Sequence, residues 1–332
     1  MDEKYFDEKI FDEKIEEIFK SYPFYSKNRI NTFFNNNDVW FRKSLGQNFL
    51  IDKNIIRKIY NTLIEYKKDY KNFKIIEIGG GLGNISIILS NLCKNLFIIE
   101  IDKFYSSILK NIFEKNINSY DCNIKIIDKD LFDVDFENEI FKNNLTNENF
   151  IIFGAIPYNI SSKIIELISK LKNNILLSFL IVQKEYYERI DIFNRISNIN
   201  RRKNKEDKPS YLTIFVNYHF EINKLFHISK NSFYPIPKVD STAFILKPKK
   251  SLLNKEDEKK FFEFVSFCFS NKRKLILNSI KNYLIINKID IDINHILKRK
   301  ELENIKNWSS SRAEDLILNE WIELFKIISK II

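Results

Sequence analysis

Continuous apolar runs alternate with helically patterned stretches through the middle of the chain. Two of the runs, FKIIEIGGG (73–81) and NLFIIEID (95–102), end in glycines or acids, and apolar residues at helical spacing follow at 103–116. Three later runs lie at 123–130, 149–158 and 174–185. Strands that are apolar throughout and alternate with helices predict a parallel sheet covered on both faces, and therefore an α/β fold.

The second half of the chain has other patterns. Residues 211–222 and 241–249 alternate as antiparallel edge strands do, and a polar, charged loop precedes them. From Lys255 the pattern is helical again, and Ser311-x-x-Glu314 is a capping box that is predicted to open the last helix.

The first residues have a different texture, because 2–15 repeat a five-residue unit, DEKYF-DEKIF-DEKI. A period of five fits neither a helix nor a strand well, so a mobile or fraying helical segment is expected up to about Asn37. The predicted domains are an N-terminal extension (1–39), an α/β domain (40–250) and a small helical domain (251–332).

Composition adds a basic surface to this picture. The 332 residues are 44% hydrophobic, enough for a sizeable core, and carry a net charge of +10 with a pI near 9.1. Abundant Lys, Asn and Ile indicate an AT-rich genome, which accounts for part of the charge. A basic surface still attracts phosphate backbones. The runs at 201–205 and 271–274 are candidate phosphate contacts, or else ordinary solvated faces.

Several classes of protein are disfavoured. Cys93, Cys122 and Cys268 are widely spaced, without C-x-x-C, and the histidines are scattered, so neither a disulfide framework nor a metal site is expected. No stretch approaches the roughly 20 apolar residues that span a bilayer. The acidic N-terminus lacks the apolar core of a signal peptide. A cytoplasmic protein without a membrane segment is expected.

Glycine is scarce, so its positions are informative. The six glycines lie in three loops: Gly46; Gly79, Gly80, Gly81 and Gly83; and Gly154. Such a cluster after a strand allows close approach of a cofactor to the backbone at a helix N-terminus. The dinucleotide pattern G-x-G-x-x-G would need glycine where Asn84 or Ser86 stands, which disfavours a nicotinamide enzyme.

Acids follow the next two predicted strands. Glu100 lies 21 positions after Gly79, where a carboxylate can accept hydrogen bonds from both hydroxyls of a ribose. Asp130 ends the third strand, where a carboxylate can accept from the amine of an adenine. Taken alone, Glu100 is equally well interpreted as a solvated acid at a strand end, and Asp130 is better interpreted as a surface acid or a helix cap. Together with the glycine loop, they predict a pocket for an adenosyl group.

A further loop, GAIPYN (154–159), follows the fourth apolar run. It holds an X-Pro-Tyr unit at the carboxyl edge of the predicted sheet, the edge where open α/β folds bind ligands. Taken alone, the loop is a turn closed by proline.

Nine stretches, in order, resemble the ribosomal RNA adenine N6,N6-dimethyltransferase family, of the small-subunit type linked to kasugamycin sensitivity. They are SLGQNFLIDKNII (44–56), EIGGGLG (77–83), IEID (99–102), DKDLF (128–132), GAIPYNISSKII (154–165), IVQKEYYERI (181–190), FYPIPKVDS (233–241), FSNKRKLILNSI (269–280) and SRAEDL (311–316).

The resemblance implies a Rossmann-like S-adenosylmethionine-dependent methyltransferase sheet with a small C-terminal helical domain. It implies methyl transfer to two adjacent adenines near the 3′ end of small-subunit rRNA in a pre-ribosomal particle, by a monomer without a metal. The implied cofactor residues are Gln47, Asn48, Phe49, Leu50, Glu77, Gly79, Gly81, Gly83, Glu100, Asp130 and Ala155. The implied target-base residues are Ala155, Ile156, Pro157, Tyr158 and Phe233, although core packing is an alternative role for Phe233.

Two positions depart from the family pattern. Gly80 replaces a common Pro, which is expected to loosen the glycine loop, and Ala155 replaces an Asn whose amide oxygen would accept from adenine N6. Two alternatives therefore stay open. One is the large-subunit adenine methyltransferase of the macrolide-resistance type. The other is a non-catalytic rRNA-binding assembly factor that retains the cofactor pocket.

Overall fold

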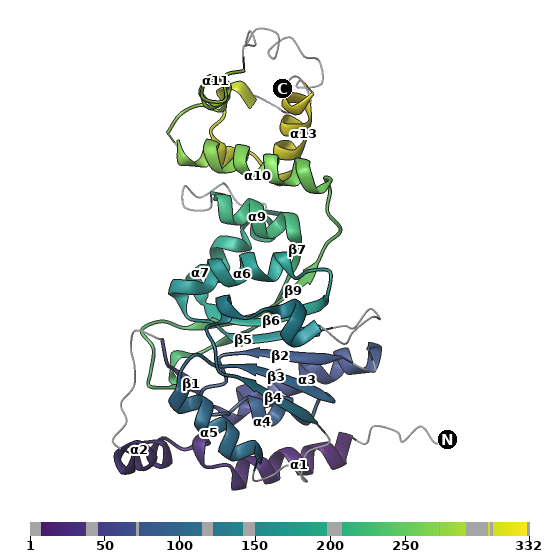
Figure 1. The fold of residues 1–332 in the computed structure, drawn as a ribbon. Coiled ribbons are helices and arrows are strands. Elements are labelled where there is room, and N and C mark those ends of the chain that lie inside the picture. The colour runs from purple at the N-terminus through teal and green to yellow at the C-terminus, as the bar shows by residue number, and fades with distance from the viewer. Residues whose placement is uncertain are drawn as a thin grey trace. The chain divides into compact units, whose positions relative to one another are not determined.

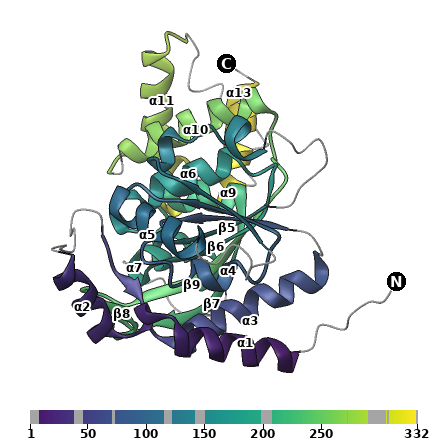
Figure 2. The same cartoon turned by 60° about the horizontal axis from the view of Figure 1, so that its bottom comes forward.

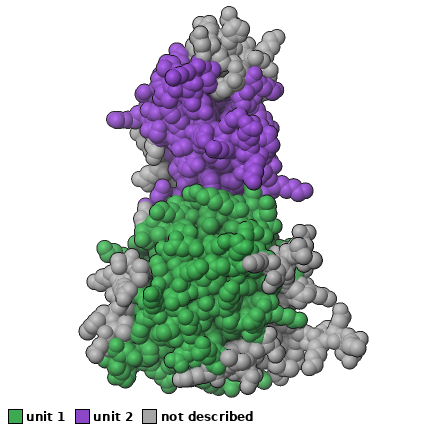
Figure 3. All heavy atoms as spheres, in the orientation of Figure 1, with its two compact units in different colours: residues 1–184, 223–247 green, residues 185–222, 248–332 purple. Residues whose placement is uncertain are grey.

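The computed structural model describes residues 8–37, 46–70, 73–114, 122–141, 150–197, 208–271, 273–289, 305 and 308–330. The chain divides into two compact units, which are described separately (Figure 3). Unit 1 comprises residues 1–184 and 223–247, and unit 2 comprises residues 185–222 and 248–332. The predicted domain limits at 39/40 and 250/251 stay predictions.

A seven-stranded sheet has the order β4-β3-β2-β5-β6-β9-β7 (Figure 1). Its strands are β2 (Lys74–Ile78), β3 (Asn95–Ile99), β4 (Asn123–Ile127), β5 (Phe150–Ala155), β6 (Ile175–Gln183), β7 (Phe220–Ile228) and β9 (Ser241–Pro248). The pairs from β4 to β6 are parallel, whereas β6 and β9 are antiparallel. A mostly parallel sheet with helices confirms the predicted α/β class.

Parallel pairing places the carboxyl ends of successive strands at one edge of the sheet. Ile78 at the end of β2 pairs with Ile99 of β3 on one side and with Gly154 of β5 on the other. The glycine loop, the Glu100 region and the loop after Gly154 therefore meet at this edge, as the order of apolar runs predicts.

Helices of unit 1 connect and cover these strands. They are α3 (Lys53–Asp69), α4 (Ser86–Leu89), α5 (Lys103–Glu114) and α6 (Ser161–Lys170), with short turns η4 (Leu131–Asp133), η5 (Glu137–Phe141), η6 (Tyr158–Ile160) and η7 (Lys230–Ser232). Asp52 caps α3, because its side chain accepts hydrogen bonds from the backbone N–H groups of Asn54 and Ile55. A separate two-stranded sheet joins β1 (Phe49–Leu50) to β8 (Phe233–Tyr234).

The segment before the sheet forms three helical elements of unit 1. These are α1 (Glu8–Ser21), η1 (Pro23–Tyr25) and α2 (Lys27–Asn36). Ile15, Phe19 and Tyr22 recur at helical spacing and are buried in the same core as the sheet. Residues 8–37 are helical, as expected, and the apolar stripe of α1 provides a buried face that the five-residue repeat does not reveal. The expected mobility stays a prediction. Residues 2–7 of the repeat lie outside the described residues.

Unit 2 is helical apart from the start of β7 and the end of β9. Its elements are α7 (Lys184–Ile190, of which Lys184 belongs to unit 1), α8 (Ile192–Ser197), α9 (Tyr211–His219), α10 (Lys255–Ser270), α11 (Ile276–Ile286), η9 (Trp308–Ser310), η10 (Ala313–Asp315) and α13 (Leu318–Ser329). A second core gathers buried aromatic side chains of α10 and α13, including Phe261, Phe264 and Trp321. The predicted helical domain, residues 251–332, lies within this unit, which also includes residues 185–222.

The edge strand expected at 211–222 is wrong over most of its length. Helix α9 occupies Tyr211–His219, and β7 begins only at Phe220. The cause is a reciprocal cap, in which Ser210 Oγ accepts from Thr213 N–H at 3.3 Å and Thr213 Oγ1 accepts from Ser210 N–H at 3.0 Å. The antiparallel strand expected at 241–249 is confirmed as β9, but its expected edge position is wrong, because β9 lies between β6 and β7.

The predicted start of the last helix is also wrong. Helix α13 begins at Leu318, where Glu320 Oε2 accepts a hydrogen bond from Ile317 N–H at 2.8 Å. The carboxylate of Glu314 instead forms an ion pair with Lys208 of the same unit. Glu314, which the local spacing assigns to a helix cap, is therefore paired with Lys208, a residue distant in sequence.

Candidate active site

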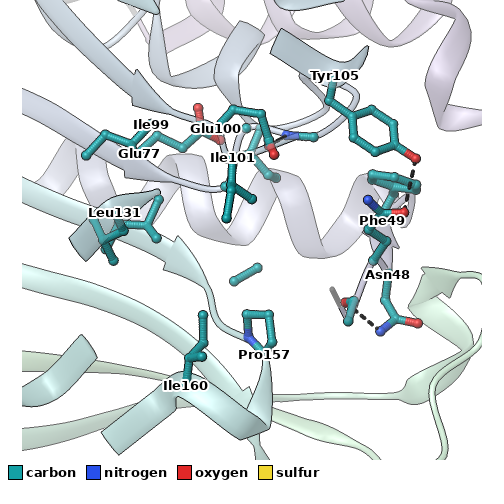
Figure 4. A pocket seen from close by; sticks show the side chains of 18 of the residues that line it. Asn48, Phe49, Glu77, Ile99, Glu100, Ile101, Tyr105, Leu131, Pro157 and Ile160 are labelled. Atoms are coloured by element: carbon teal, nitrogen blue, oxygen red, sulfur yellow. Dashed lines mark hydrogen bonds between the residues drawn. The ribbon is translucent and has the colours of Figure 1, made fainter. Parts of the chain in front are cut away.

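A cavity of about 310 Å³ opens in unit 1 at the carboxyl edge of the parallel strands (Figure 4). Its lining includes ten of the predicted cofactor residues: Gln47, Asn48, Phe49, Leu50, Glu77, Gly79, Gly81, Glu100, Asp130 and Ala155. Gly83 does not line this cavity. Segments far apart in sequence thus meet at one place because the strands before them are parallel neighbours.

The glycine loop after β2 has a backbone that only glycine adopts easily. Gly79 and Gly81 have φ of +77° and +52°, in the left-handed region. A Cβ on Gly81 would lie 2.9 Å from Phe49 Cε1. A Cβ on Gly80 would lie 2.5 Å from Ile98 Cγ2 and 2.8 Å from Leu109 Cδ1. Gly80 therefore lets the loop pack closely on β3 and α5. From the sequence, Gly80 is expected only to loosen the loop, and this packing is not predicted.

Glu100, just after β3, ties this loop in place. Its Oε2 accepts a hydrogen bond from Gly81 N–H at 2.8 Å, and its Oε1 accepts from Asp102 N–H at 2.9 Å. Burial raises the pKa of this carboxyl, while the two N–H groups oppose the rise. A carboxylate has about four acceptor positions. Glu100 can therefore hold the loop and still accept from a ligand in the cavity.

Asp130 follows β4, the strand that pairs with β3. Its Oδ1 accepts a hydrogen bond from Phe132 N–H at 3.0 Å and so caps η4. The same residue lines the cavity, so the helix-cap role and the ligand-binding role are compatible. Ile101, Leu131 and Phe132 add apolar surface to the lining, as a flat ring requires.

Glu77, near the end of β2, is the most buried acid of the cavity, with 2% of its surface exposed. Its Oε2 has no hydrogen-bond partner among the described residues. Desolvation, and secondarily the charge of Glu100, raises the pKa of Glu77 to about 8. An acceptor buried without a partner fits a cationic ligand group such as the ammonium of S-adenosylmethionine, whose positive charge would lower this pKa and favour the ionised carboxylate.

Residues 47–50 form one side of the cavity. Gln47 Nε2 donates to Asp102 Oδ2 at 3.1 Å, and Tyr105 Oη donates to Gln47 Oε1 at 3.4 Å. The rings of Phe49 and Tyr105 pack edge to face, with centroids 5.4 Å apart. Strand β1 is also fixed to β8, with Leu50 opposite Phe233. This segment is therefore held by both α5 and β8.

A second cavity, of about 400 Å³, adjoins the first. The two share Gly46, Asn48, Ala155, Pro157 and Asn159 as lining residues. The second is also lined by Ile156, Ile181, Val182, Gln183, Phe233, Pro237, Val239 and Ser241. The loop that follows β5 is thus a common wall between the two cavities.

The backbone of this common wall is firmly held. Ile156 N–H donates to Ile181 O at 2.8 Å, and Ser161 Oγ donates to Pro157 O at 2.9 Å. Gly46 packs against the loop so closely that a Cβ there would lie 2.9 Å from Pro157 Cβ. The carbonyl oxygen of Ile156 accepts no hydrogen bond from the described residues. Ala155 is exposed at the junction of the cavities.

The remaining predicted residues have mixed positions. Phe233 is 4% exposed and belongs to the core, and it also lines the second cavity. The side chain of Tyr158 lies outside the described part of the structure, as do residues 201–205 and Lys272. Arg273 and Lys274 are exposed between α10 and α11.

Sequence reasoning missed several lining residues. Ile101 and Phe132 lie just after β3 and β4, and Gln183 ends β6, so their positions at strand ends are a signal that was available. Val239 and Ser241 reach the second cavity only through the pairing of β9 with β6, which local patterns do not reveal.

The sheet order and the glycine loop with two strand-end acids define a Rossmann-like, S-adenosylmethionine-dependent methyltransferase. The family model described as "Ribosomal RNA adenine dimethylase" matches residues 39–318. The chain belongs to the ribosomal RNA adenine dimethylase family, which confirms the predicted family, enzyme class and cofactor.

Relatives and solved structures agree with this placement. The chain is 35% identical to the ribosomal RNA small subunit methyltransferase A of Malacoplasma penetrans, over 84% of this chain and 93% of the relative. A dimethyladenosine transferase from Plasmodium falciparum superposes with a TM-score of 0.60 at 25% identity, covering 82% of this chain and 96% of that one. The 23S rRNA methyltransferase ErmE shares the fold, with a TM-score of 0.59 at 20% identity, covering 85% and 99%.

Among the described residues, no helix has the length and apolar character to cross a bilayer. Within the same residues, no group of three or more His, Cys, Asp or Glu side chains is arranged to hold a metal ion.

The buried carboxyl of Glu77 makes stability depend on pH. Its pKa is raised from 4.5 to about 8, so the folded state keeps a proton that the unfolded chain has lost. The linked stability is fully present below pH 4.5 and is lost as pH rises toward 8. In Glu77→Gln this loss is absent, so urea unfolding should show the variant gaining stability over wild type across that window. The exposed control Glu137→Gln should show a constant difference. A constant difference for Glu77→Gln would contradict the burial argument.

Proposed function

We propose that this protein transfers methyl groups from S-adenosylmethionine to N6 of two adjacent adenines near the 3′ end of small-subunit rRNA. The observation that carries the proposal is the pair of adjoining cavities that share the loop at Ala155, Pro157 and Asn159. One cavity suits a cofactor and the other suits a base, and this loop, with Gly46 and Asn48, lines both. The name of the Malacoplasma penetrans relative supports the small subunit as the target.

In the first cavity, Glu100 accepts from the ribose hydroxyls, and Asp130 accepts from the adenine amine. Ile101 and Phe132, which are 49% and 44% exposed, provide apolar contacts for the adenine ring. Glu77 faces the ammonium group at the methionine end. When bound, the cofactor supplies an electrophilic methyl group on a sulfonium.

In the second cavity, the protein has to position a flipped adenine. The lone pair of N6 is delocalised into the ring, so the amine must be oriented by hydrogen bonds before it can attack. The carbonyl oxygen of Ile156 is an acceptor for this amine, and Pro157 keeps the loop rigid. Phe233 borders one side of the base, and Tyr158 is assigned to the other side on the family motif alone.

Two alternatives differ in target or in chemistry. The large-subunit alternative is suggested by the fold that this chain shares with ErmE. At 20% identity, however, the likeness shows the fold alone. The relatives at 34–36% identity are named for the small subunit. The assembly-factor alternative rests on Ala155. The carbonyl oxygen of Ile156 argues against it, because this oxygen accepts no hydrogen bond from the described residues and so leaves the loop an acceptor for the amine.

The RNA surface is proposed to lie on unit 2. Arg273 and Lys274 are exposed in a short turn between two helices, so both can approach a phosphate backbone. The proposed partner is a pre-ribosomal small subunit, the proposed state is a monomer and the proposed location is the cytoplasm.

The proposed activity predicts dimethyladenosine in small-subunit rRNA. The protein is incubated with labelled S-adenosylmethionine and unmethylated small subunits, large subunits or neither, and rRNA fragments are analysed by mass spectrometry. Dimethyladenosine confined to the small subunit is expected. Modified large-subunit RNA would favour the first alternative, and tight small-subunit binding without methylation would favour the second.

In the same assay, Ala155→Asn should raise the single-turnover rate, because the amide restores an acceptor for N6. An oriented hydrogen bond in such a site is worth roughly 10²–10³ in rate, of which Ile156 O already supplies part. Affinity for S-adenosylmethionine should change little. Asn173→Ala, at an exposed position before β6, is the surface control. An unchanged rate for Ala155→Asn would remove residue 155 from the target-base site.

Glu100→Ala should weaken S-adenosylmethionine binding by roughly 1.5–3 kcal/mol, the loss expected for charge-assisted hydrogen bonds. Calorimetry measures the change, and circular dichroism at the same temperature checks the fold. Asp133→Ala, an exposed acid outside the cavity lining, should bind like wild type. Equal affinity in both variants would overturn the assignment of Glu100.

Binding to small subunits should weaken steeply with salt, because counterions are released from the RNA. Arg273→Glu with Lys274→Glu should reduce the slope of log affinity against log salt, by about 0.9 for each phosphate that is no longer neutralised, and leave cofactor affinity unchanged. The matched control is Lys163→Glu with Lys170→Glu, which makes the same charge change on α6. Equal slopes in the two double variants would place the RNA surface elsewhere.

A further inference from the structure

The N-terminal segment 8–37 lies before residue 39, where the match to the family begins, yet it contacts the cofactor loop directly. The hydroxyl of Tyr22 donates a hydrogen bond to the carbonyl oxygen of Leu82. The hydroxyl of Tyr25 donates to the carbonyl oxygen of Asn84 at 2.6 Å. Both tyrosines are 8% exposed, so these bonds are formed in the protein interior.

Asn84 returns the contact with its side chain. Its Nδ2 donates to Phe24 O at 2.8 Å and to Leu50 O at 2.9 Å. One buried amide therefore joins the N-terminal segment, the glycine loop and β1. Leu82, Asn84 and Leu50 all line the proposed cofactor cavity, so the segment supports the cavity wall from behind.

Gly83 explains how the segment approaches so closely. Its φ is +80°, and a Cβ there would lie 2.7 Å from the Tyr22 hydroxyl oxygen. Gly83 does not itself line the cavity. Position 83 therefore requires glycine for two reasons, the left-handed backbone and the close contact with Tyr22. Contact with the cofactor is not one of them.

The segment is also anchored away from the loop, so it can act as a fixed support. Lys53 Nζ, at the start of α3, donates to Phe19 O at 2.8 Å, and Arg57 forms an ion pair with Glu16. Helix α1 accordingly runs beside α3 (Figure 2). The ring of Phe34 packs on that of Phe49, another lining residue, with centroids 6.5 Å apart.

We propose that residues 8–37 are a positioning element of the cofactor site, acting through Tyr22 and Tyr25. A loop with several glycines loses much conformational entropy when it orders around a ligand. The two hydroxyls fix the carbonyl groups of Leu82 and Asn84 before the ligand binds. The loop therefore loses less conformational entropy on binding. The proposal rests on the cofactor site of the proposed function.

The test is Tyr22→Phe with Tyr25→Phe in the full chain, which removes the hydroxyls and keeps both rings in the core. S-adenosylhomocysteine is the calorimetric probe. We expect its Kd to rise roughly three- to thirty-fold, as for the loss of two ordinary hydrogen bonds. KM for S-adenosylmethionine should rise in parallel, while kcat at saturating cofactor stays within about twofold, because the target-base loop is untouched.

Tyr66→Phe is the matched control, since Tyr66 packs on the same core from α3 without contacting the loop. Affinities are compared well below the melting temperature of each variant, so that partial unfolding does not lower the measured affinity. If the double variant does not fold, Tyr25→Phe alone makes the same test with a smaller expected change.

The outcomes separate the two proposals. Wild-type protein that fails to bind S-adenosylhomocysteine would overturn the cofactor site itself. Wild-type binding with equal Kd in the double variant and in Tyr66→Phe would overturn the positioning role and leave the cofactor site standing. A fall in kcat with unchanged KM would also contradict it, because the effect would then lie outside cofactor binding.

Discussion

The hydrogen bonds that the Glu100 carboxylate accepts from Gly81 N–H and Asp102 N–H are the interaction on which the site depends. They link the loop after β2 to the loop after β3, and so define one wall of the cavity. The parallel register of the strands brings these loops together, and Glu100 then fixes their spacing. Because the carboxylate is buried, its acceptor positions need hydrogen-bond donors. Backbone N–H groups fill some of these positions, and a ligand can fill the rest.

Much of this wall could be predicted from local sequence. Apolar runs fix the strands, and the glycines with Glu100 and Asp130 directly follow them, so parallel topology alone brings them to one edge. The supporting elements could not be predicted in this way. Tyr22 reaches Leu82 across 60 positions. Helix α9 was not predicted either. Its apolar run is compatible with a strand, and the reciprocal cap at Ser210 that favours the helix is evident only in the structure.

The backbone of the loop at 154–159 is fixed by its neighbours. Ile156 N–H and Pro157 O are held by strand and helix residues, while Ile156 O accepts no hydrogen bond from the described residues. If the loop lines the target-base site as proposed, Ala155 can replace an Asn without removing every acceptor from the wall. The missing amide would then change how strongly the amine is oriented.

Cofactor and target base are proposed to occupy the two cavities on either side of this loop. A crystal structure with a bisubstrate analogue, in which an adenine is tethered to the sulfur position of the cofactor, would show both sites at once. We expect the cofactor ribose within hydrogen-bond distance of Glu100 and the tethered adenine beside Phe233, with its amine facing Ile156 O. An analogue that binds at Glu100 with its tethered adenine in solvent, and with the second cavity empty, would contradict this proposal.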